Sequence, residues 1–355
     1  MVLASVAFIL AAVVVTSGCG SSDAVRPAST QSAGVHALKG AGATFPALLY
    51  KNWFEAYTKA HPESHITFDS TGSGDGVRRF IGKGATPEEK VDFGASDAAL
   101  TDSEIQQVSG GALMLPVTAG SIVLSYNIPE ISGELRLSRD AYAGIFLGEI
   151  KSWDDPAIAA SNPGKALPKY PICVVVRQDG SGTTFGFTTH LNAISTKWHD
   201  KFGAHKSIAW PNAPTERKGN EGVAGAIKMT AGSIGYVEFA YAKKAELPMA
   251  SLENRAGRYV APTEESCAST LAKIDLPENL RAFMPDPEGS ESYPIVSLTW
   301  ILLYRKYDNV EKTTDLQQLF RWCLTEGQKS SSALGYIPLP QNVSRKAYEA
   351  LDSLK

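Results

Sequence analysis

The residues best suited to chemistry form a glycine-rich turn in the middle of the chain, Arg177-Gln-Asp-Gly-Ser-Gly-Thr183. The apolar run 172–176 before the turn is typical of a buried strand, and apolar residues at helical spacing follow it as far as Leu191. A helix that begins at this turn would aim several free backbone N–H groups at one point, beside two hydroxyl groups and an arginine. The turn therefore predicts a binding site for an anion.

Three other turns share this design, because in each a strand ends and small or hydroxyl-bearing residues begin a helix. They are Gly42-Ala-Thr-Phe45, Gly72-Ser-Gly74 and Gly94-Ala-Ser-Asp97. In α/β sheets, ligands bind outside the carboxyl ends of the strands, where helix N-termini converge. A single turn of this kind is commonly structural, but four of them could line one cavity.

Enzyme motifs built on similar turns give little support to an enzyme. Neither the G-x-x-x-x-G-K-[ST] pattern nor the G-x-G-x-x-G pattern is present, so the glycines do not indicate a nucleotide site. Gly94-Ala-Ser-Asp-Ala98 differs by one residue from the G-x-S-x-G turn of serine hydrolases. Such a hydrolase would need His190, His199 or His205 as its base, and none of them lies in a recognisable motif.

The segments around these turns alternate between expected strands and helices, which predicts an α/β fold. Helices are expected at 47–60 (after Pro46), 138–147, 223–229 and 316–324. Strands are expected at 65–68, 91–97, 172–176 and 233–237. Two longer extended stretches are expected at 113–127 and 295–304.

Composition and charge narrow the class of protein. The 355 residues are 43% hydrophobic and 20% charged, which is ordinary for a globular protein of one large domain or two. The net charge of −3 gives no reason to expect nucleic acid as a partner. Histidines and cysteines show no metal-ligand spacing, so no metal or other cofactor is expected. Cys173, Cys267 and Cys323 are expected as buried free thiols, with a Cys173–Cys267 disulfide as the alternative.

The N-terminus has the pattern of an export signal. Residues 2–15 are almost all apolar, too short a run to span a membrane, and small residues precede Cys19. This pattern resembles a bacterial lipoprotein signal over residues 1–18, with lipid attachment at Cys19; a plain secretory signal is the alternative. Residues 19–37, rich in Ser, Ala and Gly, are expected to form a flexible tether. The protein is therefore expected in the periplasm or on the outer face of the cytoplasmic membrane.

Several motifs in order resemble the phosphate-binding protein of bacterial phosphate ABC transporters, a periplasmic solute-binding protein. The resemblance rests on Gly40-Ala-Gly-Ala-Thr-Phe-Pro46, Val91-Asp-Phe-Gly-Ala-Ser-Asp97 and Arg177-x-Asp-Gly-Ser-Gly-Thr183. Supporting motifs are Lys151-Ser-Trp-Asp-Asp155, Lys218-Gly-Asn-Glu-Gly222, Gly235-Tyr-Val-Glu-Phe239 and Pro262-Thr-Glu-Glu265. The resemblance covers the chain from about residue 38 to its end.

The resemblance implies an α/β, two-lobed periplasmic-binding-protein fold of type II. Lobe I would comprise 38–118 plus 296–355 and lobe II 127–290, with hinge crossovers at 119–126 and 291–295. The implied function is high-affinity capture of inorganic phosphate by lobe closure and its delivery to the permease subunits of an ABC transporter, without catalysis. Another tetrahedral oxyanion is the alternative ligand, and a phosphate-ester hydrolase is the alternative function.

The same resemblance implies which residues bind phosphate. The implied set is Thr44, Phe45 through its backbone N–H, Ser73, Asp97, Arg177, Ser181, Gly182 through its backbone, and Thr183. At Ser73 the sequence departs from the pattern, since Gly74-Asp75 follows where relatives often carry smaller or hydroxyl-bearing residues. Asp75 could therefore alter the local geometry.

The chemistry of two site residues can also be argued directly. Arg177 carries a rigid fork of donors that can hold two oxygens of one phosphate. Asp179, two residues later, is expected to lock that fork by pairing with it, with an ordinary turn-capping aspartate as the alternative.

Asp97 is unusual, because a carboxylate near an anion should repel it. Near neutral pH phosphate still carries a proton, and an ionised carboxylate can accept a hydrogen bond from it. Sulfate has no such proton, and a buried acceptor left without a donor costs several kcal/mol, on the order of a thousandfold in affinity. Asp97 is therefore predicted to discriminate phosphate from sulfate, with a helix N-cap as the alternative role.

Overall fold

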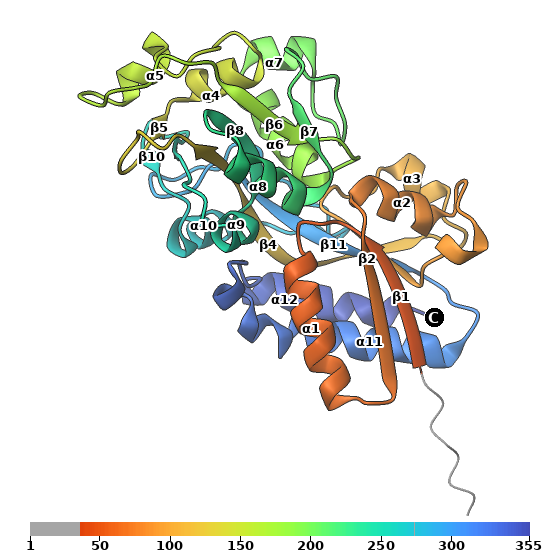
Figure 1. Cartoon of the computed structure of the whole chain (residues 1–355). Coiled ribbons are helices and arrows are strands. Elements are labelled where there is room, and N and C mark those ends of the chain that lie inside the picture. The colour runs from red at the N-terminus through yellow and green to blue at the C-terminus, as the bar shows by residue number, and fades with distance from the viewer. Residues whose placement is uncertain (1–35, 273) are drawn as a thin grey trace, which may run out of the picture. The chain divides into compact units, whose positions relative to one another are not determined.

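A mixed sheet of eight strands lies at the centre of the folded body (Figure 1). The computed structural model describes residues 36–272 and 274–355. In spatial order the strands are β2 (Ser64–Ser70), β1 (His36–Gly42), β3 (Phe93–Ser96), β11 (Val296–Tyr304), β4 (Ala112–Asn127), β8 (Ser233–Glu238), β6 (Cys173–Arg177) and β7 (Thr215–Arg217). A smaller sheet has the order β10 (Tyr259–Val260), β9 (Ser251–Glu253) and β5 (Arg136–Leu137).

Helices cover both ends of the large sheet (Figure 1). They are α1 (Ala47–Ala60), α2 (Ser73–Ile81), α3 (Asp102–Gln106), α4 (Arg139–Phe146), α5 (Pro156–Ser161), α6 (Gly182–Ile194), α7 (Thr196–Lys201), α8 (Gly219–Met229), α9 (Phe239–Lys244), α10 (Glu264–Leu271), α11 (Val310–Leu324) and α12 (Gln341–Ala350). We call β1–β3 with α1–α3, α11 and α12 the first lobe, and β6–β8 with α4–α9 the second lobe.

Two antiparallel strands, β4 and β11, join the lobes. β4 pairs with β11 from Ala112 to Ser121 and then with β8 from Ile122 to Asn127. Within the first lobe β1 is parallel to β2 and β3, and within the second lobe β6 is parallel to β7 and β8. Because parallel strands carry their carboxyl ends at one edge, the loops that follow β1, β2 and β3 come together.

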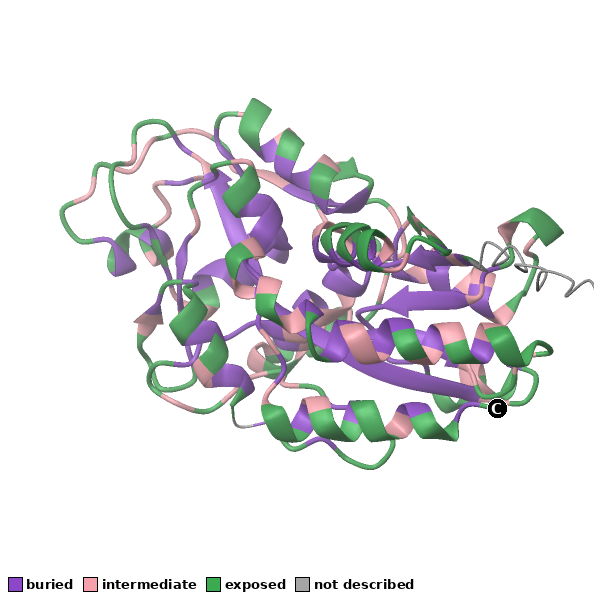
Figure 2. Cartoon of the chain, turned by 90° about the horizontal axis from the view of Figure 1, so that it is seen from below, coloured by how far each residue is buried: buried purple, intermediate pink, exposed green. Residues whose placement is uncertain are grey.

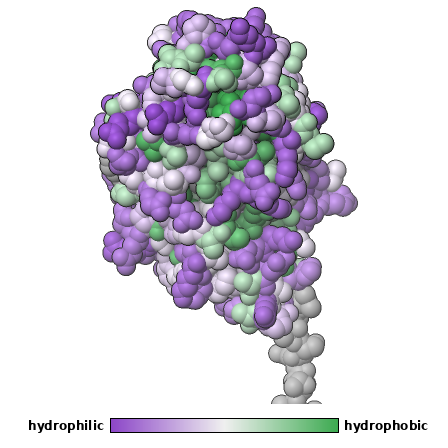
Figure 3. All heavy atoms as spheres, turned by 60° about the vertical axis from the view of Figure 1, so that its left-hand side comes forward, coloured by the Kyte–Doolittle hydropathy of each residue, from purple (hydrophilic) through white to green (hydrophobic). Residues whose placement is uncertain are grey.

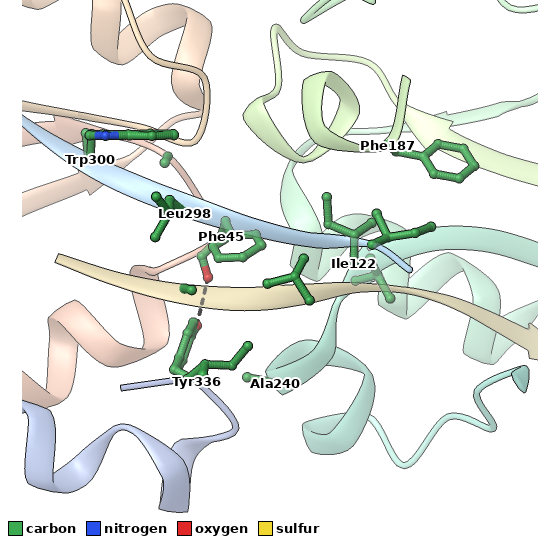
Figure 4. Packing of buried hydrophobic residues seen from close by; sticks show 14 of the residues in the cluster. Phe45, Ile122, Phe187, Ala240, Leu298, Trp300 and Tyr336 are labelled. Atoms are coloured by element: carbon green, nitrogen blue, oxygen red, sulfur yellow. Dashed lines mark hydrogen bonds between the residues drawn. The ribbon is translucent and has the colours of Figure 1, made fainter. Parts of the chain in front are cut away.

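The core is one continuous cluster of apolar side chains that includes residues of both lobes. Burial follows the strands and the inner faces of the helices (Figure 2). Leu298 on β11 and Ile122 on β4 are fully or almost fully buried along the strands that join the lobes, with Phe45 beside them and Phe187 in the second lobe (Figure 4). Burial of such side chains gives about 1.5–3 kcal/mol each, so packing holds β4 and β11 in place.

Most of the expected elements are confirmed, with differences at their ends. The helix at 47–60 has its expected bounds, and β4 begins one residue before the predicted stretch. Helix α8 begins at Gly219 rather than 223, so the Lys218-Gly-Asn-Glu-Gly222 motif forms its first turn. β1 begins at His36, inside the predicted tether, because His36 and Ala37 already pair with β2.

The cysteines of the described residues are free thiols. Cys267 and Cys323 are buried, whereas Cys173 is only half-buried at the start of β6, where a fully buried position was expected. The alternative Cys173–Cys267 disulfide is not formed. Cys19 and the predicted signal lie outside the described residues.

The surface is mixed in character. Figure 3 shows hydrophilic residues spread over the face it presents, with hydrophobic residues in patches between them. Within residues 36–272 and 274–355, no helix has both the length and the apolar character that crossing a membrane requires.

Candidate anion-binding site

The four predicted turns meet where the two lobes face each other. Within the first lobe, the carbonyl of Gly42 accepts from the N–H groups of Thr71 (3.0 Å) and Gly72 (2.8 Å), and Ala43 donates to Ala95 on β3 (2.9 Å). Between the lobes, Gly74 donates to the carbonyl of Gly180 (2.7 Å). The turn that follows β6 therefore lies directly against the turns of the first lobe.

Gly182 brings the N-terminus of α6 against Ser73 and Asp97. A Cβ atom at Gly182 would lie 2.5 Å from the Oγ of Ser73 and 2.5 Å from the Cβ of Asp97, which is closer than side chains can approach. Only a glycine fits here. This contact places the free end of a helix in the second lobe beside the carboxylate of the first.

Arg177 stands at the end of β6 with its side chain almost fully buried. Its Nε donates to Oδ1 of Asp179 (2.8 Å), its Nη2 donates to Oδ2, and its Nη1 donates to the hydroxyl of Thr183 (3.3 Å). A guanidinium has five N–H groups, so one N–H on each of Nη1 and Nη2 remains available to an anion. The predicted pairing of Asp179 with Arg177 is thus present in the structure.

Asp179 holds the arginine in one orientation. Its Oδ1 also accepts from the backbone N–H of Gly219 at the start of α8 (2.9 Å). Burial by itself would raise the pKa of Asp179, but the hydrogen bonds and charge of Arg177 keep it below its ordinary value. Asp179 is therefore a fixed anion that orients the guanidinium.

Asp97 follows β3 and is 2% exposed. Its Oδ1 accepts from the hydroxyl of Thr299 on β11 (2.7 Å), and its Oδ2 accepts from Ser73 (3.3 Å), whose Oγ also accepts from the N–H of Asp97 (3.2 Å). Burial raises the pKa of Asp97 to about 7, although Thr299, Arg177 and Ser73 stabilise the ionised form. The helix N-cap role considered for Asp97 is wrong, because Thr101 caps the next helix, α3.

Thr44 and Phe45 come from the loop between β1 and α1. The hydroxyl of Thr44 accepts from the backbone N–H (3.2 Å) and the Nδ2 (2.9 Å) of Asn220. The carbonyl of Phe45 accepts from the hydroxyl of Tyr336 (2.7 Å), drawn as the dashed line in Figure 4. The bonds from Asn220 hold the loop close to the second lobe, and the bond from Tyr336 holds it within the first.

Several donors of this site have no acceptor among the described residues. They are the backbone N–H groups of Phe45, Gly182 and Thr183. Ser181, fully buried, caps α6 by accepting from the N–H of Thr184 (3.0 Å). Unpaired N–H groups at a buried helix N-terminus are well suited to an oxyanion.

All eight residues predicted to bind phosphate thus lie on the four turns that meet between the two lobes. Asp75 does not enter it: its carboxylate pairs with Arg78 (2.7 Å) and Arg79 (2.7 Å) on α2, away from Ser73. The concern that Asp75 alters the geometry at Ser73 is not supported.

Sequence reasoning did not single out two side chains of this network, Thr299 and Asn220. Thr299 is a fully buried hydroxyl residue in a strand made mostly of apolar residues, and a polar side chain in such a strand is a usable signal. Asn220 lies in a motif that had been noted, but its role appears only when α8 and the loop after β1 are brought together.

Two residues considered for a serine hydrolase, Ser96 and His190, have other partners in the structure. The hydroxyl of Ser96 donates to the carbonyl of Ala98 (2.6 Å). His190 lies between the hydroxyl of Tyr142 (2.8 Å) and the carbonyl of Pro285 (2.7 Å), and burial lowers its pKa to about 4. Leaving out residue 273, no group of three or more His, Cys, Asp or Glu side chains between residues 36 and 355 is placed to hold a metal ion.

Comparison with known proteins gives matches over most of the chain. The family model described as the PBP superfamily domain matches residues 27–326. The phosphate-binding protein PstS of Pasteurella multocida is 40% identical over 312 residues, 87% of this chain and 88% of that protein. The phosphate-binding protein PstS of Methanocaldococcus jannaschii is 36% identical over 366 residues, 97% of this chain and 92% of that protein.

Solved structures show the same fold at lower identity. A high-affinity periplasmic phosphate-binding protein (PfluDING) bound with phosphate aligns with a TM-score of 0.74 and 21% identity, over 88% of this chain and 93% of that one. A phosphate-binding protein from Stenotrophomonas maltophilia aligns with a TM-score of 0.73 and 20% identity, again over 88% and 93%. The two-lobed architecture is therefore shared with proteins of known structure.

Proposed function

The chain belongs to the PBP superfamily and, within it, to the phosphate-binding proteins, and from this premise we propose that it captures inorganic phosphate and delivers it to the permease of an ABC transporter. The observation that supports this function is that the unpaired donors of the site lie around the buried carboxylate of Asp97. Such a site is complementary to an oxyanion that carries one proton.

Each predicted residue has a distinct role in the proposed complex. Arg177 offers two N–H groups to phosphate oxygens, and the backbone N–H groups of Phe45, Gly182 and Thr183 offer three more. Hydroxyl groups from both lobes complete the shell: those of Thr44, Ser181 and Thr183, and that of Ser73 once its proton turns from Asp97 to the anion. Asp179 does not contact the anion but fixes the orientation of the Arg177 guanidinium by pairing with it.

Asp97 determines whether phosphate or sulfate binds. In its ionised form it accepts the hydrogen bond of the P–OH group, whereas sulfate would meet a buried acceptor with nothing to donate. Leaving that acceptor unpaired costs several kcal/mol, on the order of a thousandfold in affinity. Phosphate is therefore favoured over sulfate, the other tetrahedral oxyanion considered.

Closure of the lobes completes the site. We place lobe I at 38–118 plus 296–355, lobe II at 127–290, and the hinge at 119–126 and 291–295. The first segment covers the change of partner of β4 from β11 to β8, the natural point for a bend. Closure hides the ion from water and presents a joined surface to the permease.

The protein is proposed to act outside the cytoplasmic membrane as a receptor without catalytic activity. Residues 1–18 would direct export, and Cys19 would carry a lipid anchor at the end of a tether. If so, Cys19→Ser releases the protein from the membrane fraction. A protein that stays membrane-bound after this substitution would exclude the anchor.

Calorimetry on the protein freed of bound ligand tests the main proposal. Phosphate should give a large heat of binding. A large excess of sulfate should give none and should not compete with phosphate. Absence of heat with phosphate would overturn the function, and competition by sulfate would indicate a general oxyanion receptor. Turnover of a chromogenic phosphate ester that is lost in Ser181→Ala would instead favour the hydrolase.

A further inference from the structure

Asn220 is a fully buried amide at the boundary between the lobes. It lies in the first turn of α8 in the second lobe, and it contacts Thr44 of the first lobe and Thr183 of α6. Neither the predicted phosphate ligands nor the partners of Arg177 include it. Asn220 therefore lies between two hydroxyl groups of the site.

The orientation of the Asn220 amide is set by the backbone. Its Oδ1 accepts from the N–H of Glu238 at the end of β8 (2.9 Å). An amide turned the other way would direct its NH₂ group at this N–H, donor against donor, so the oxygen must face β8. The Nδ2 group therefore faces the site, where it donates to Thr44 (2.9 Å) and to Thr183 (3.1 Å).

Both threonine hydroxyls consequently have their acceptor positions filled. A hydroxyl has two lone pairs and one proton. The Oγ1 of Thr44 accepts from the N–H and from the Nδ2 of Asn220. The Oγ1 of Thr183 accepts from the Nδ2 of Asn220 and from Nη1 of Arg177. Each hydroxyl is left with its proton as the one group it can offer.

We propose that Asn220 is a positioning residue that makes Thr44 and Thr183 obligatory donors to the bound anion. The inference rests on the proposed binding of phosphate and deepens it. The oxygens that face these two hydroxyls must be unprotonated, so the P–OH group is turned toward Asp97. Asn220 thus supports the selection of phosphate over sulfate by Asp97, without contacting the ligand.

The proposal also explains why Asn220 connects the lobes. Its Nδ2 reaches Thr44 only while the loop after β1 lies against α8, that is, while the lobes are together. The same amide therefore orients the two hydroxyls at the moment when the ion is enclosed. In an open protein Thr44 would be free to accept as well as donate.

The substitution Asn220→Asp distinguishes a residue that orients the two threonine hydroxyls from one that only packs. A carboxylate has the shape of the amide and can still accept from the N–H of Glu238, but its second oxygen cannot donate. Thr44 and Thr183 would then turn their protons toward it and away from the anion. A residue that only packs, or only caps α8, would tolerate this isosteric change.

The charged and titratable groups around Asn220 come from several elements. They are Arg177 and Asp179 at the end of β6, Glu238 at the end of β8, Tyr241 on α9, Asp97 after β3, and Lys218 and Glu221 beside it in the chain. All of them are shared by the wild-type protein and the variant. The ratio of the two phosphate affinities at each pH therefore isolates the new carboxyl group.

Calorimetry with inorganic phosphate tests the inference between about pH 5 and about pH 8. Asn220→Asp should weaken binding by roughly 100-fold or more near the upper end, because two donors are lost and a negative charge is added. Toward the lower end the deficit relative to wild type should shrink, since a protonated carboxyl regains one donor. Asn220→Ala should show a smaller deficit that does not change with pH. An Asn220→Asp deficit that equals that of Asn220→Ala at every pH overturns the inference.

A matched control is available in Asn254, which is also fully buried and whose amide donates to the carbonyls of Gly289, Ser290 and Ser292. Asn254→Asp should lower thermal stability and leave the phosphate affinity and its pH profile unchanged. If the wild-type protein itself does not bind phosphate, the proposed function fails and this inference with it. If wild type binds and Asn220→Asp binds equally well, only the inference fails.

A measurement on the wild-type protein covers the case in which the variant does not fold. In the phosphate complex, the hydroxyl protons of Thr44 and Thr183 should exchange slowly and show scalar coupling to ³¹P in NMR spectra. Detection of both couplings supports the inference. A complex in which neither proton couples to phosphorus overturns it.

Discussion

The hydroxyl of Thr299 on β11 donates a 2.7 Å hydrogen bond to Oδ1 of Asp97, which directly follows the neighbouring strand β3 but lies far from Thr299 in sequence. The bond fixes which carboxylate oxygen faces the strand and which remains for the site. It also stabilises the ionised form of a carboxyl group whose pKa burial raises. Much of the behaviour of the site follows from this pair.

Loss of the Thr299 hydroxyl should weaken phosphate binding. In Thr299→Val, the Asp97 carboxylate would lose a hydrogen bond, and such bonds to charged groups contribute about 1.5–3 kcal/mol. A larger fraction of Asp97 would then be protonated near neutral pH, and a protonated carboxyl group cannot accept the hydrogen bond of the P–OH group. We expect a roughly 10- to 100-fold loss of affinity by calorimetry. Ser297→Ala on the same strand is the control, because its hydroxyl donates only to the neighbouring carbonyl. Wild-type affinity in Thr299→Val would contradict this role.

Asp97→Asn should reverse the preference between anions. The Thr299 hydroxyl needs an acceptor, so the amide oxygen takes the place of Oδ1 and the NH₂ group takes that of Oδ2. The site would then offer a donor where phosphate presents its proton. Calorimetry should show weaker phosphate binding and measurable sulfate binding. Unchanged rejection of sulfate would exclude Asp97 as the discriminator, and Asp92→Asn, whose carboxylate pairs with Lys312, is the control.

The stability of the ligand-free protein should fall as the pH rises from about 4 through the raised pKa of Asp97. Its pKa is raised to about 7 in the folded protein, whereas in the unfolded chain it is close to the ordinary value near 4. The folded state therefore keeps a proton that the unfolded chain has released, and this contribution to stability is complete below about pH 4 and is lost as the pH rises through about 7.

Denaturant unfolding of wild type and Asp97→Asn measures this contribution directly. The free energy of unfolding of the wild type should fall relative to that of the variant by a few kcal/mol between about pH 4 and about pH 8. Two curves that stay parallel over this range would contradict the raised pKa. Phosphate binding should show the opposite trend, because it requires the ionised carboxylate.

The fold was largely predictable because its elements have strong local patterns. The apolar stripe and preceding proline of α1 define a helix without help from the rest of the chain. β4 is buried at all of its residues but the last, and its many Val, Ile and Leu residues indicated a long extended stretch, which the family resemblance then placed at the hinge. Element ends were less predictable, as at α8, whose first turn contains two glycines, Gly219 and Gly222.

The site was predictable in part for the same reason. Its glycine-rich turns follow strands, and the motif order indicated the family and hence the ligands. Thr299 and Asn220 could not be assigned from the chain, because their partners Asp97 and Thr44 are brought to them only by sheet pairing and by the approach of α8. Interactions of that kind depend on the tertiary structure, which local periodicity does not encode.

Gly182 provides a test of how closely the lobes approach. A Cβ atom there would lie 2.5 Å from both Ser73 and Asp97, so Gly182→Ala must hold the lobes apart or displace the carboxylate. Phosphate affinity should fall by roughly 100-fold or more, since both the enclosure and the Asp97 hydrogen bond are lost. The open, ligand-free protein should keep its stability, because alanine favours a helix over glycine by about 1 kcal/mol.

The control is Gly225→Ala in α8, where an added Cβ meets no atom within 4 Å. It should gain stability and bind phosphate like the wild type. If Gly182→Ala also binds like the wild type, the two lobes do not close as tightly around the ion as the contact between α6 and Asp97 requires.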